Sequence, residues 1–307
     1  MTSSAERTRH NTFAGLLLDR GGGYRHDPGW LAAQRAAPTA RFLACDADGR
    51  APVAAGRLQW STSGDVSPAA PANLLGVGAD GPLFALRDAV PAVVTPGVEW
   101  LALRAAAAVL DHAEAGLLAY ARGLANWQAV AHCCVTCGAP LALVDGGHRA
   151  VCTRCGRQHF PRTDPAIIVI VEHGDACLLG RQASWRARQY STLAGFVEPG
   201  ESLADAVRRE VREETSVEVV DCDYHSSQPW PFPASLMLGF TARAAGRAIR
   251  LADGELEDAR WYTAADLESG LRDGSLRLPP PTSIAWRLVA HWLRTRANAD
   301  LAAWMHP

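Results

Sequence analysis

The sequence GFVEPGESLADAVRREVREETSV, residues 195–217, carries the most regular pattern in the chain. Its apolar side chains recur every four residues, at Leu203, Val207 and Val211. This spacing predicts an amphipathic helix with one buried stripe. At roughly 100° per residue, Glu210 and Glu214 fall on the same side as the stripe. The arginines of the helix are predicted to point the other way, toward solvent: Arg208, Arg209 and Arg212.

The glutamates of this helix have two interpretations. A solvated charged face, whose pairs contribute roughly a few tenths of a kcal/mol each, would place the carboxylates opposite the apolar stripe. The helical angles contradict this for Glu210 and Glu214. Carboxylates spaced by three and four residues can instead converge on a hard cation such as Mg²⁺ or Mn²⁺, and bound cations offset the cost of burying charge. We therefore interpret the acidic side of the helix as a metal site.

The fixed positions of this stretch resemble the Nudix box, G-x5-E-x7-R-E-U-x-E-E-x-G-U, in which U is an aliphatic residue. The matching residues are Gly195, Glu201, Arg209, Glu210, Val211, Glu213, Glu214 and Val217. Ser216 stands where the family has the glycine that ends the helix in a left-handed turn, a conformation that serine adopts less readily. This departure affects the turn and removes no ligand.

In Nudix hydrolases this stretch forms a loop, a helix and a second loop within a mixed β-sheet sandwiched between helices. The family's glutamates bind divalent cations at a diphosphate, which implies Glu210, Glu213 and Glu214 as metal ligands. Glu201 is implied as a partner for Arg209. Metal ions neutralise the diphosphate, lower the pKa of a bound water and stabilise the departing phosphate. The resemblance leaves open which glutamate accepts the proton.

Two cysteine pairs predict a structural zinc site. The motifs CVTCG and CTRCG place Cys134 and Cys137 before Cys152 and Cys155, with 14 residues between the pairs. Two residues between thiolates let one tight turn present both sulfurs to a tetrahedral ion, and the glycine after each pair relieves the turn. The alternative, reduced cysteines in a hydrophobic core, does not explain the paired spacing. The predicted zinc ribbon is a fold element and indicates no function by itself.

A second motif, SQPWPFPAS at residues 227–235, holds aromatic side chains on a stiff backbone. Its prolines fix φ, so Trp230 and Phe232 are presented for stacking on a flat ring with little conformational entropy left to lose. The alternative is a proline-rich surface loop whose aromatic rings pack into the core. The motif, called the array below, resembles the SQPWPFPxS array of the NADH pyrophosphatases, the Nudix subfamily that also removes NAD caps from RNA.

The subfamily resemblance implies further site residues by matching position. The implied substrate contacts are Phe160, Phe196, Gln228, Pro229, Trp230, Pro231, Phe232, Pro233, Ala234, Ser235 and Ala285. Phe160 stands where the subfamily usually has tyrosine, which removes a hydroxyl group and keeps a ring for stacking. The implied metal ligands also include Glu255 and the backbone carbonyl of Ala194.

Length and composition limit the classes of protein that remain. The chain has 307 residues, 48% hydrophobic and 20% charged, as is typical of globular proteins. Its formal net charge of −2 shows no excess of basic residues of the kind that binds nucleic acid through its phosphates. No apolar run approaches the roughly 20 residues that a membrane span needs. Eight cysteines without an export signal favour a reducing compartment, so we expect a cytoplasmic protein.

The order of the motifs predicts an α+β protein of three domains. These are an N-terminal α+β domain over residues 1–125, a four-cysteine zinc ribbon over 126–162 and a Nudix domain over 163–307. The alanine-rich stretch 98–128 is predicted to form helices that are split near Gly116. The run AIIVIV, residues 166–171, predicts a buried strand.

Together these patterns predict a metal-dependent hydrolase that cleaves NADH or NAD⁺ at the diphosphate, releasing nicotinamide mononucleotide and AMP. Two alternatives keep the chemistry and change the substrate, to NAD-capped RNA 5′ ends or to nucleoside diphosphates such as ADP-ribose. An alternative of another class is a zinc-ribbon regulatory protein with a degenerate Nudix domain, for which Ser216 is the only support. The family resemblance also implies a homodimer that uses Mg²⁺ or Mn²⁺ in catalysis and Zn²⁺ in its structure.

Overall fold

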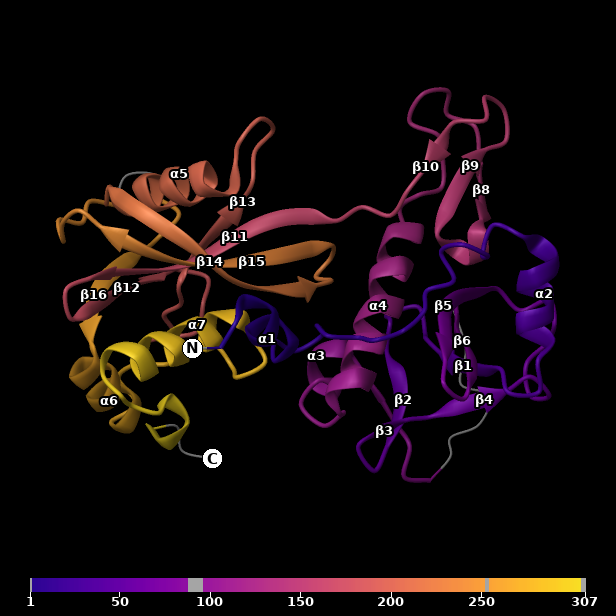
Figure 1. The fold of residues 1–307 in the computed structure, drawn as a ribbon, viewed down its shortest axis with the longest axis horizontal. Coiled ribbons are helices and arrows are strands. Elements are labelled where there is room, and N and C mark those ends of the chain that lie inside the picture. The colour runs from indigo at the N-terminus through magenta and orange to yellow at the C-terminus, as the bar shows by residue number, and fades with distance from the viewer. Residues whose placement is uncertain (1, 88–95, 252–253, 305–307) are drawn as a thin grey trace. The chain divides into compact units, whose positions relative to one another are not determined.

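The chain forms two compact units in the computed structural model, which describes residues 2–87, 96–251 and 254–304 (Figure 1). The first unit contains Met1–Ala14, Asp164–Pro229 and Ser235–Pro307, and the second contains Gly15–Thr163 and Trp230–Ala234. The first unit is therefore discontinuous in sequence, since the first residues of the chain belong with its second half. The finer division into three domains stays a prediction.

The first unit is built on a mixed β-sheet. Its strands follow the order β14-β15-β11-β12-β16, with β13 paired to β11. The strands are β11 (Asp164–His173), β12 (Ala176–Arg181), β13 (Leu193–Phe196), β14 (Val219–Trp230), β15 (Ser235–Ala244) and β16 (Asp258–Thr263). β11 runs parallel to β15 and antiparallel to β12 and β13. The predicted strand 166–171 lies within β11, and each of its residues is buried.

Helices cover both faces of this sheet, and alternation along β11 separates two cores. Ile167 and Val169 pack in the core that contains Val207 and Val211 of α5 (Leu203–Thr215). Ile168 packs in the opposite core, which is formed largely by α7 (Ile284–Arg296). The remaining helices of this unit are α1 (Ser4–Arg9), α6 (Ala264–Arg272) and η2 (Leu301–Trp304). The prediction of a mixed sheet sandwiched between helices is confirmed.

Within its described residues, the second unit combines three small sheets with helices. The sheets follow the orders β4-β1-β6-β5, β3-β2-β7 and β10-β9-β8. Their strands are β1 (Arg41–Ala44), β2 (Ala51–Ala54), β3 (Arg57–Leu58), β4 (Trp60–Thr62), β5 (Ala72–Gly78), β6 (Gly81–Leu86), β7 (Glu99–Leu101), β8 (Leu141–Val144), β9 (Arg149–Cys152) and β10 (Gln158–His159). The helical segments are α2 (Pro28–Ala36), α3 (Leu103–Ala106), α4 (His112–Gln128) and η1 (Asp145–Gly147). This mixture agrees with the predicted α+β class.

The predicted helix break near Gly116 is wrong. The alanine-rich stretch begins as strand β7, continues as the short helix α3, and breaks before α4. Asp111 is the N-cap of α4, and its carboxylate accepts a hydrogen bond from the Glu114 N–H (2.8 Å). Gly116 lies buried inside α4, five residues after the cap. The capping aspartate was the better boundary signal.

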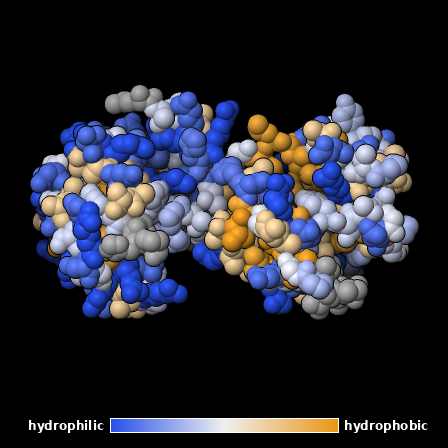
Figure 2. Space-filling view, turned by 90° about the horizontal axis from the view of Figure 1, so that it is seen from below, coloured by the Kyte–Doolittle hydropathy of each residue, from blue (hydrophilic) through white to orange (hydrophobic). Residues whose placement is uncertain are grey.

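The surface differs in character between the units. Figure 2 shows hydrophobic residues gathered on one face of the second unit, whereas the visible face of the first unit is mainly hydrophilic. Large exposed apolar side chains of the second unit include Leu17, Val109 and Val130. Apolar patches on the surface of soluble proteins can mark interaction sites. Among the described residues, no helix has the length and apolar character needed to cross a membrane.

A buried histidine makes the second unit sensitive to acid. His148 is 7% exposed, and its Nε2 donates to the Leu74 carbonyl (2.7 Å). Burial lowers the pKa of His148 to about 4, so the unfolded chain binds the extra proton between pH 6.5 and 4. We expect the free energy of unfolding to fall by on the order of 1–2 kcal/mol between pH 7 and pH 5 from this group. Urea titrations followed by circular dichroism measure the free energy of unfolding at each pH. The His148→Gln variant should show a flatter pH dependence of this free energy than the wild type. Equal slopes for the two proteins would contradict the assignment of the pH dependence to His148.

Candidate active site

Helix α5 is fixed by caps at both ends. The Ser202 hydroxyl accepts from the Asp205 N–H, and the Asp205 carboxylate accepts from the Ser202 N–H, which completes a capping box. At the other end Ser216 has φ 59° and ψ 17°, in the left-handed region. Its hydroxyl donates to the Arg250 carbonyl (2.9 Å). The serine therefore forms the turn for which the family uses glycine, and this hydrogen bond offsets part of the strain.

Two glutamates of α5 are buried, as their helical angles predict. Glu210 is 9% exposed and Glu214 is 2% exposed. The two valines of the predicted apolar stripe are fully buried in the same unit. Leu203 was predicted to extend this stripe, and that prediction is wrong, because the first residue of the helix lies at its open end and is 37% exposed. The acidic side of the helix nevertheless faces the interior.

Arg209 does not point to solvent as its helical angle predicted, because hydrogen bonds to several groups hold its guanidinium. Its Nε and Nη2 donate to the two carboxylate oxygens of Glu201 at 2.6 and 2.9 Å. Nη1 donates to Glu210 (2.9 Å) and Glu213 (3.0 Å). Nη2 also donates to the Phe196 carbonyl (2.8 Å), and the hydrogen bonds from Arg209 lower the pKa of Glu201 to about 2. Arg209 thus links α5 to β13 and to the loop that precedes α5.

Gly195 on β13 makes room for the Glu210 carboxylate. A Cβ atom added at Gly195 would lie 1.9 Å from Cδ and from Oε1 of Glu210. Burial raises the pKa of Glu210, the nearby Glu213 and Glu255 carboxylates add to this increase, and Arg209 opposes it. β13 and α5 therefore form a cradle that fits one carboxylate group and no additional side-chain atom.

The predicted metal ligands offer a suitable set of donors. A cavity of about 150 Å³ is lined by Ala194, Glu214 and Gln182, among others, and the Gln182 side chain donates to Glu255 (3.2 Å). Glu213 is half-exposed at the edge of the site. Among the described residues only the cysteine quartet brings three or more possible ligand atoms within 4.8 Å of one another. The ligand atoms of the glutamates lie farther apart than those of the cysteines. They are nevertheless oxygen donors, which hard divalent cations prefer, and the space at Gly195 holds one of them, the Glu210 carboxylate, in place.

Gln228 of the array is a buried structural group. It is 1% exposed, and its Nε2 donates to the carbonyls of Thr12 (3.0 Å) and Thr282 (2.8 Å). Its Oε1 accepts from the Ile284 N–H (2.9 Å). Both amide hydrogens and the oxygen are thus already used within the first unit. The role of Gln228 in substrate binding stays a prediction.

Sequence patterns missed the segment that holds the start of the array. Asn11 is 1% exposed, and its Nδ2 donates to Ser226 Oγ (3.0 Å) and to the Ser227 carbonyl (2.9 Å). The Ser227 N–H donates to Thr8 Oγ1 (3.2 Å). A lone asparagine near the start of a chain carries no periodicity or spacing, so nothing in the sequence pointed to this role. We call residues 8–12 the N-terminal clamp.

The aromatic tip of the array, Trp230–Ala234, belongs to the second unit. The rings of Trp230 and Phe232 meet edge to face, with centroids 4.9 Å apart and an interplanar angle of 64°. Both side chains are partly buried, and Pro231 between them is buried. Their role in stacking on a flat base stays a prediction.

The other predicted substrate contacts lie in contrasting surroundings. Phe160 and Phe196 are 62% and 60% exposed, which is unusual for large apolar side chains and leaves their rings accessible for stacking. Ala285, at the start of α7, is 2% exposed. The remaining array residues are partly buried or exposed: Pro229, Pro233, Ala234 and Ser235.

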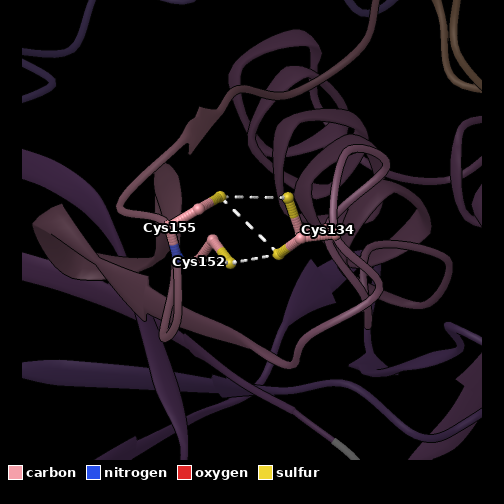
Figure 3. A group of neighbouring side chains, drawn as sticks. Cys134, Cys152 and Cys155 are labelled. Carbon is pink, nitrogen blue, oxygen red and sulfur yellow. Dashed lines mark hydrogen bonds between the residues drawn. The ribbon is translucent and has the colours of Figure 1, made fainter.

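The four cysteines of the two pairs converge as the spacing predicts (Figure 3). The sulfur of Cys134 lies 3.7 Å from that of Cys155, and the sulfur of Cys137 lies 3.4 Å from that of Cys152 and 3.6 Å from that of Cys155. Tetrahedral Zn²⁺ with Zn–S bonds of about 2.3 Å places sulfurs about 3.8 Å apart, so the group fits zinc. Backbone amides lower the pKa of Cys134 and of Cys152, which favours the thiolate at these two positions. No position is left open for catalysis, and zinc here would brace the fold.

Two family models match the chain. The NUDIX domain matches residues 161–281, and the NADH pyrophosphatase-like rudimentary NUDIX domain matches residues 27–127. The chain is 42% identical over 215 residues to the NAD-capped RNA hydrolase NudC of Stutzerimonas stutzeri, covering 70% of this chain and 75% of that one. It is 40% identical over 202 residues to the NAD-capped RNA hydrolase NUDT12 of Macaca fascicularis, covering 62% of this chain and 44% of that one. The chain thus spans less than half of the length of the NUDT12 relative.

The matches extend the interpretation of both units. The N-terminal residues 27–127, which the sequence patterns describe only as α+β, resemble a rudimentary Nudix domain. The NUDIX match includes β13, α5 and the array, so the cradle around Glu210 lies within it. Because that match covers the acidic helix, and because the similarity to NudC extends over 75% of that relative, the chain belongs to the Nudix hydrolase family.

Proposed function

We propose that this protein hydrolyses the diphosphate of NADH or NAD⁺ and releases nicotinamide mononucleotide and AMP. The observation that carries the proposal is the pair of buried carboxylates on α5, Glu210 and Glu214, beside a set of oxygen donors. The intact array and the similarity to proteins named NAD-capped RNA hydrolase support a substrate that contains the NAD group.

The chemistry divides between the cation and the chain. Glu210, Glu213, Glu214, Glu255 and the Ala194 carbonyl would hold Mg²⁺ or Mn²⁺, which supplies charge neutralisation at the diphosphate and an acidified water. Arg209 fixes the orientation of the Glu210 carboxylate through Nη1 and anchors the preceding loop through Glu201. A glutamate of this cluster would accept the proton of the attacking water, and the aromatic rings of the array would bind a flat base.

Three further properties belong to the same proposal. The four cysteines would hold one structural Zn²⁺. The apolar face of the second unit suits a homodimer, because exposed apolar surface of this kind is covered in oligomers (Figure 2). The cysteines outside the quartet, such as the buried Cys45 and Cys177, are free thiols, which is consistent with a reducing cytoplasm.

NAD-capped RNA 5′ ends are the second candidate substrate. The similarity to proteins named NAD-capped RNA hydrolase favours this substrate. The net charge of −2 opposes strong affinity for the RNA chain. Turnover of free NADH and of an NAD-capped transcript, compared across a salt series, ranks the two, since phosphate contacts weaken as salt rises.

Product analysis tests the proposal. Purified protein is incubated with NADH, with and without Mn²⁺, and the nucleotides are separated by chromatography. We expect nicotinamide mononucleotide and AMP in equal amounts only when the cation is present. Equal turnover of ADP-ribose and NADH would replace the proposal with a broader nucleoside diphosphate hydrolase. Absence of products from every diphosphate with Mg²⁺ or Mn²⁺ would favour a regulatory protein that retains the fold.

A further inference from the structure

The array has few hydrogen-bond donors of its own. Its three prolines lack an N–H group, so the tip cannot form a regular ladder of backbone hydrogen bonds. One short contact inside the tip joins the Phe232 N–H to the Trp230 carbonyl (2.7 Å). The backbone carbonyls of the tip are therefore paired by donors from elsewhere, and an unpaired carbonyl would be costly at Pro231, which is buried.

Asn126 on α4 supplies those donors. Its Nδ2 donates to the Pro231 carbonyl (3.0 Å) and to the Pro233 carbonyl (2.7 Å). The two acceptors flank Phe232, so both amide hydrogens of one side chain bracket an aromatic residue. Pro231 also packs on α4, since a Cβ atom at Gly123 would lie 3.9 Å from Pro231 Cβ. Residues about 105 positions apart in sequence thus form one local structure.

Arg104 on α3 contacts both rings of the tip. Its guanidinium carbon lies 4.0 Å from the centroid of Phe232 and 4.8 Å from that of Trp230, within the range of cation–π contacts. Among the ion pairs of the described residues, none includes Arg104. Burial against the rings lowers the pKa of Arg104, and arginine stays charged at neutral pH. The aromatic rings thus take the place of an acidic partner.

We propose that Asn126 and Arg104 are positioning residues, which hold Trp230 and Phe232 in the geometry that binds the flat base of the substrate. The inference rests on the proposed function of the array. It gives the rudimentary Nudix domain a task beyond folding, because both residues lie outside the match to the NUDIX domain. Neither side chain needs to touch the substrate: each acts by restricting the tip before binding, which reduces the entropy lost on binding.

Hydrogen exchange provides a test that does not depend on activity. The amides of Trp230, Phe232 and Ala234 should exchange several-fold faster in Asn126→Ala and Asn126→Asp than in the wild type. Asn126→Asp is nearly isosteric, yet it replaces the donating amide with a carboxylate that repels two carbonyls. The control is Arg41→Leu, which replaces an exposed arginine of the same unit. Unchanged exchange of the tip in both Asn126 variants would overturn the proposal.

Kinetics provide the second test, on the full chain with NADH and Mn²⁺. We expect Asn126→Ala to raise KM about tenfold with kcat changed much less, since pre-organisation of the binding loop is lost. Arg104→Leu should act in the same direction, and Arg104→Lys should recover part of the loss because it keeps a cation over the rings. Unchanged KM in Asn126→Ala and Arg104→Leu would overturn the proposal.

A double-mutant cycle separates positioning from general stabilisation. The effect of Asn126→Ala on KM should disappear in a Trp230→Ala, Phe232→Ala background, because the side chains that Asn126 positions are gone. If the effects of Asn126→Ala and of the two ring substitutions on KM are fully additive, the positioning role is overturned. If the wild type fails to hydrolyse NADH, the proposed function is wrong, whereas hydrogen exchange still decides whether Asn126 fixes the tip.

Discussion

Gly195→Ala should lower kcat by about 10²-fold or more, because a displacement of a catalytic group by about 1 Å costs this much. The new methyl group would lie 1.9 Å from the carboxylate of Glu210, and the end of a flexible side chain moves more easily than the backbone of β13. The fold should therefore survive while the cradle is lost. Turnover of NADH with saturating Mn²⁺, measured beside the thermal midpoint, checks this.

Gly246→Ala is the control for this substitution. Gly246 lies in the same unit, and an added Cβ atom there would meet nothing within 4 Å. It should retain wild-type kcat and thermal midpoint. A Gly195→Ala enzyme with wild-type turnover would show that the position of the Glu210 carboxylate is not needed, and would remove the main structural support for the metal site.

Removal of zinc should unfold the ribbon. The hydrophobic cluster around the quartet contains Cys134, Cys137 and Cys152 themselves, and otherwise only Ala139 and Leu141. Such a small core cannot replace a structural zinc, whose binding contributes roughly 10 kcal/mol or more in small zinc domains. Cys152→Ser should therefore lose the metal and expose residues near 132–160 to limited proteolysis. Zinc content by mass spectrometry and the proteolytic pattern measure both effects.

Cys133→Ser is the matched control, since Cys133 is exposed and adjoins Cys134 without belonging to the quartet. It should keep one zinc per chain and the wild-type proteolytic pattern. Stoichiometric zinc in Cys152→Ser, or a metal-free wild type with unchanged protease resistance, would contradict a structural zinc site. Chelation of the wild type should reproduce the Cys152→Ser pattern without any substitution.

The parts that could be predicted from the sequence are those set by local spacing. Helical periodicity placed Glu210 and Glu214 on the buried side of α5, because each side-chain direction follows from its position along the helix. Two-residue spacing placed the cysteines, because one tight turn fixes both sulfurs. The same rule failed for Arg209, whose long side chain bends toward carboxylates that lie outside the helix period.

The parts that could not be predicted depend on residues far apart in the chain. Asn11 bonds to Ser226 and Asn126 bonds to Pro231, and neither asparagine stands in a motif or a periodic stretch. The hydrogen bonds of Gln228 to Thr12, Thr282 and Ile284 likewise had no signal in the array motif to which it belongs. Such contacts arise from tertiary packing, and a single sequence carries no local signal for them.

The N-terminal clamp has a consequence for how the protein is made. Asn11 is translated before Ser226, to which it bonds and which lies 215 positions later. At about 5–20 residues per second, the ribosome needs roughly 10–40 s to reach that partner. Meanwhile the intervening 15–163 segment can acquire its own core. During synthesis Asn11 therefore lacks this partner until Ser226 has been added, and the contact can form only after residues 15–163 have been made.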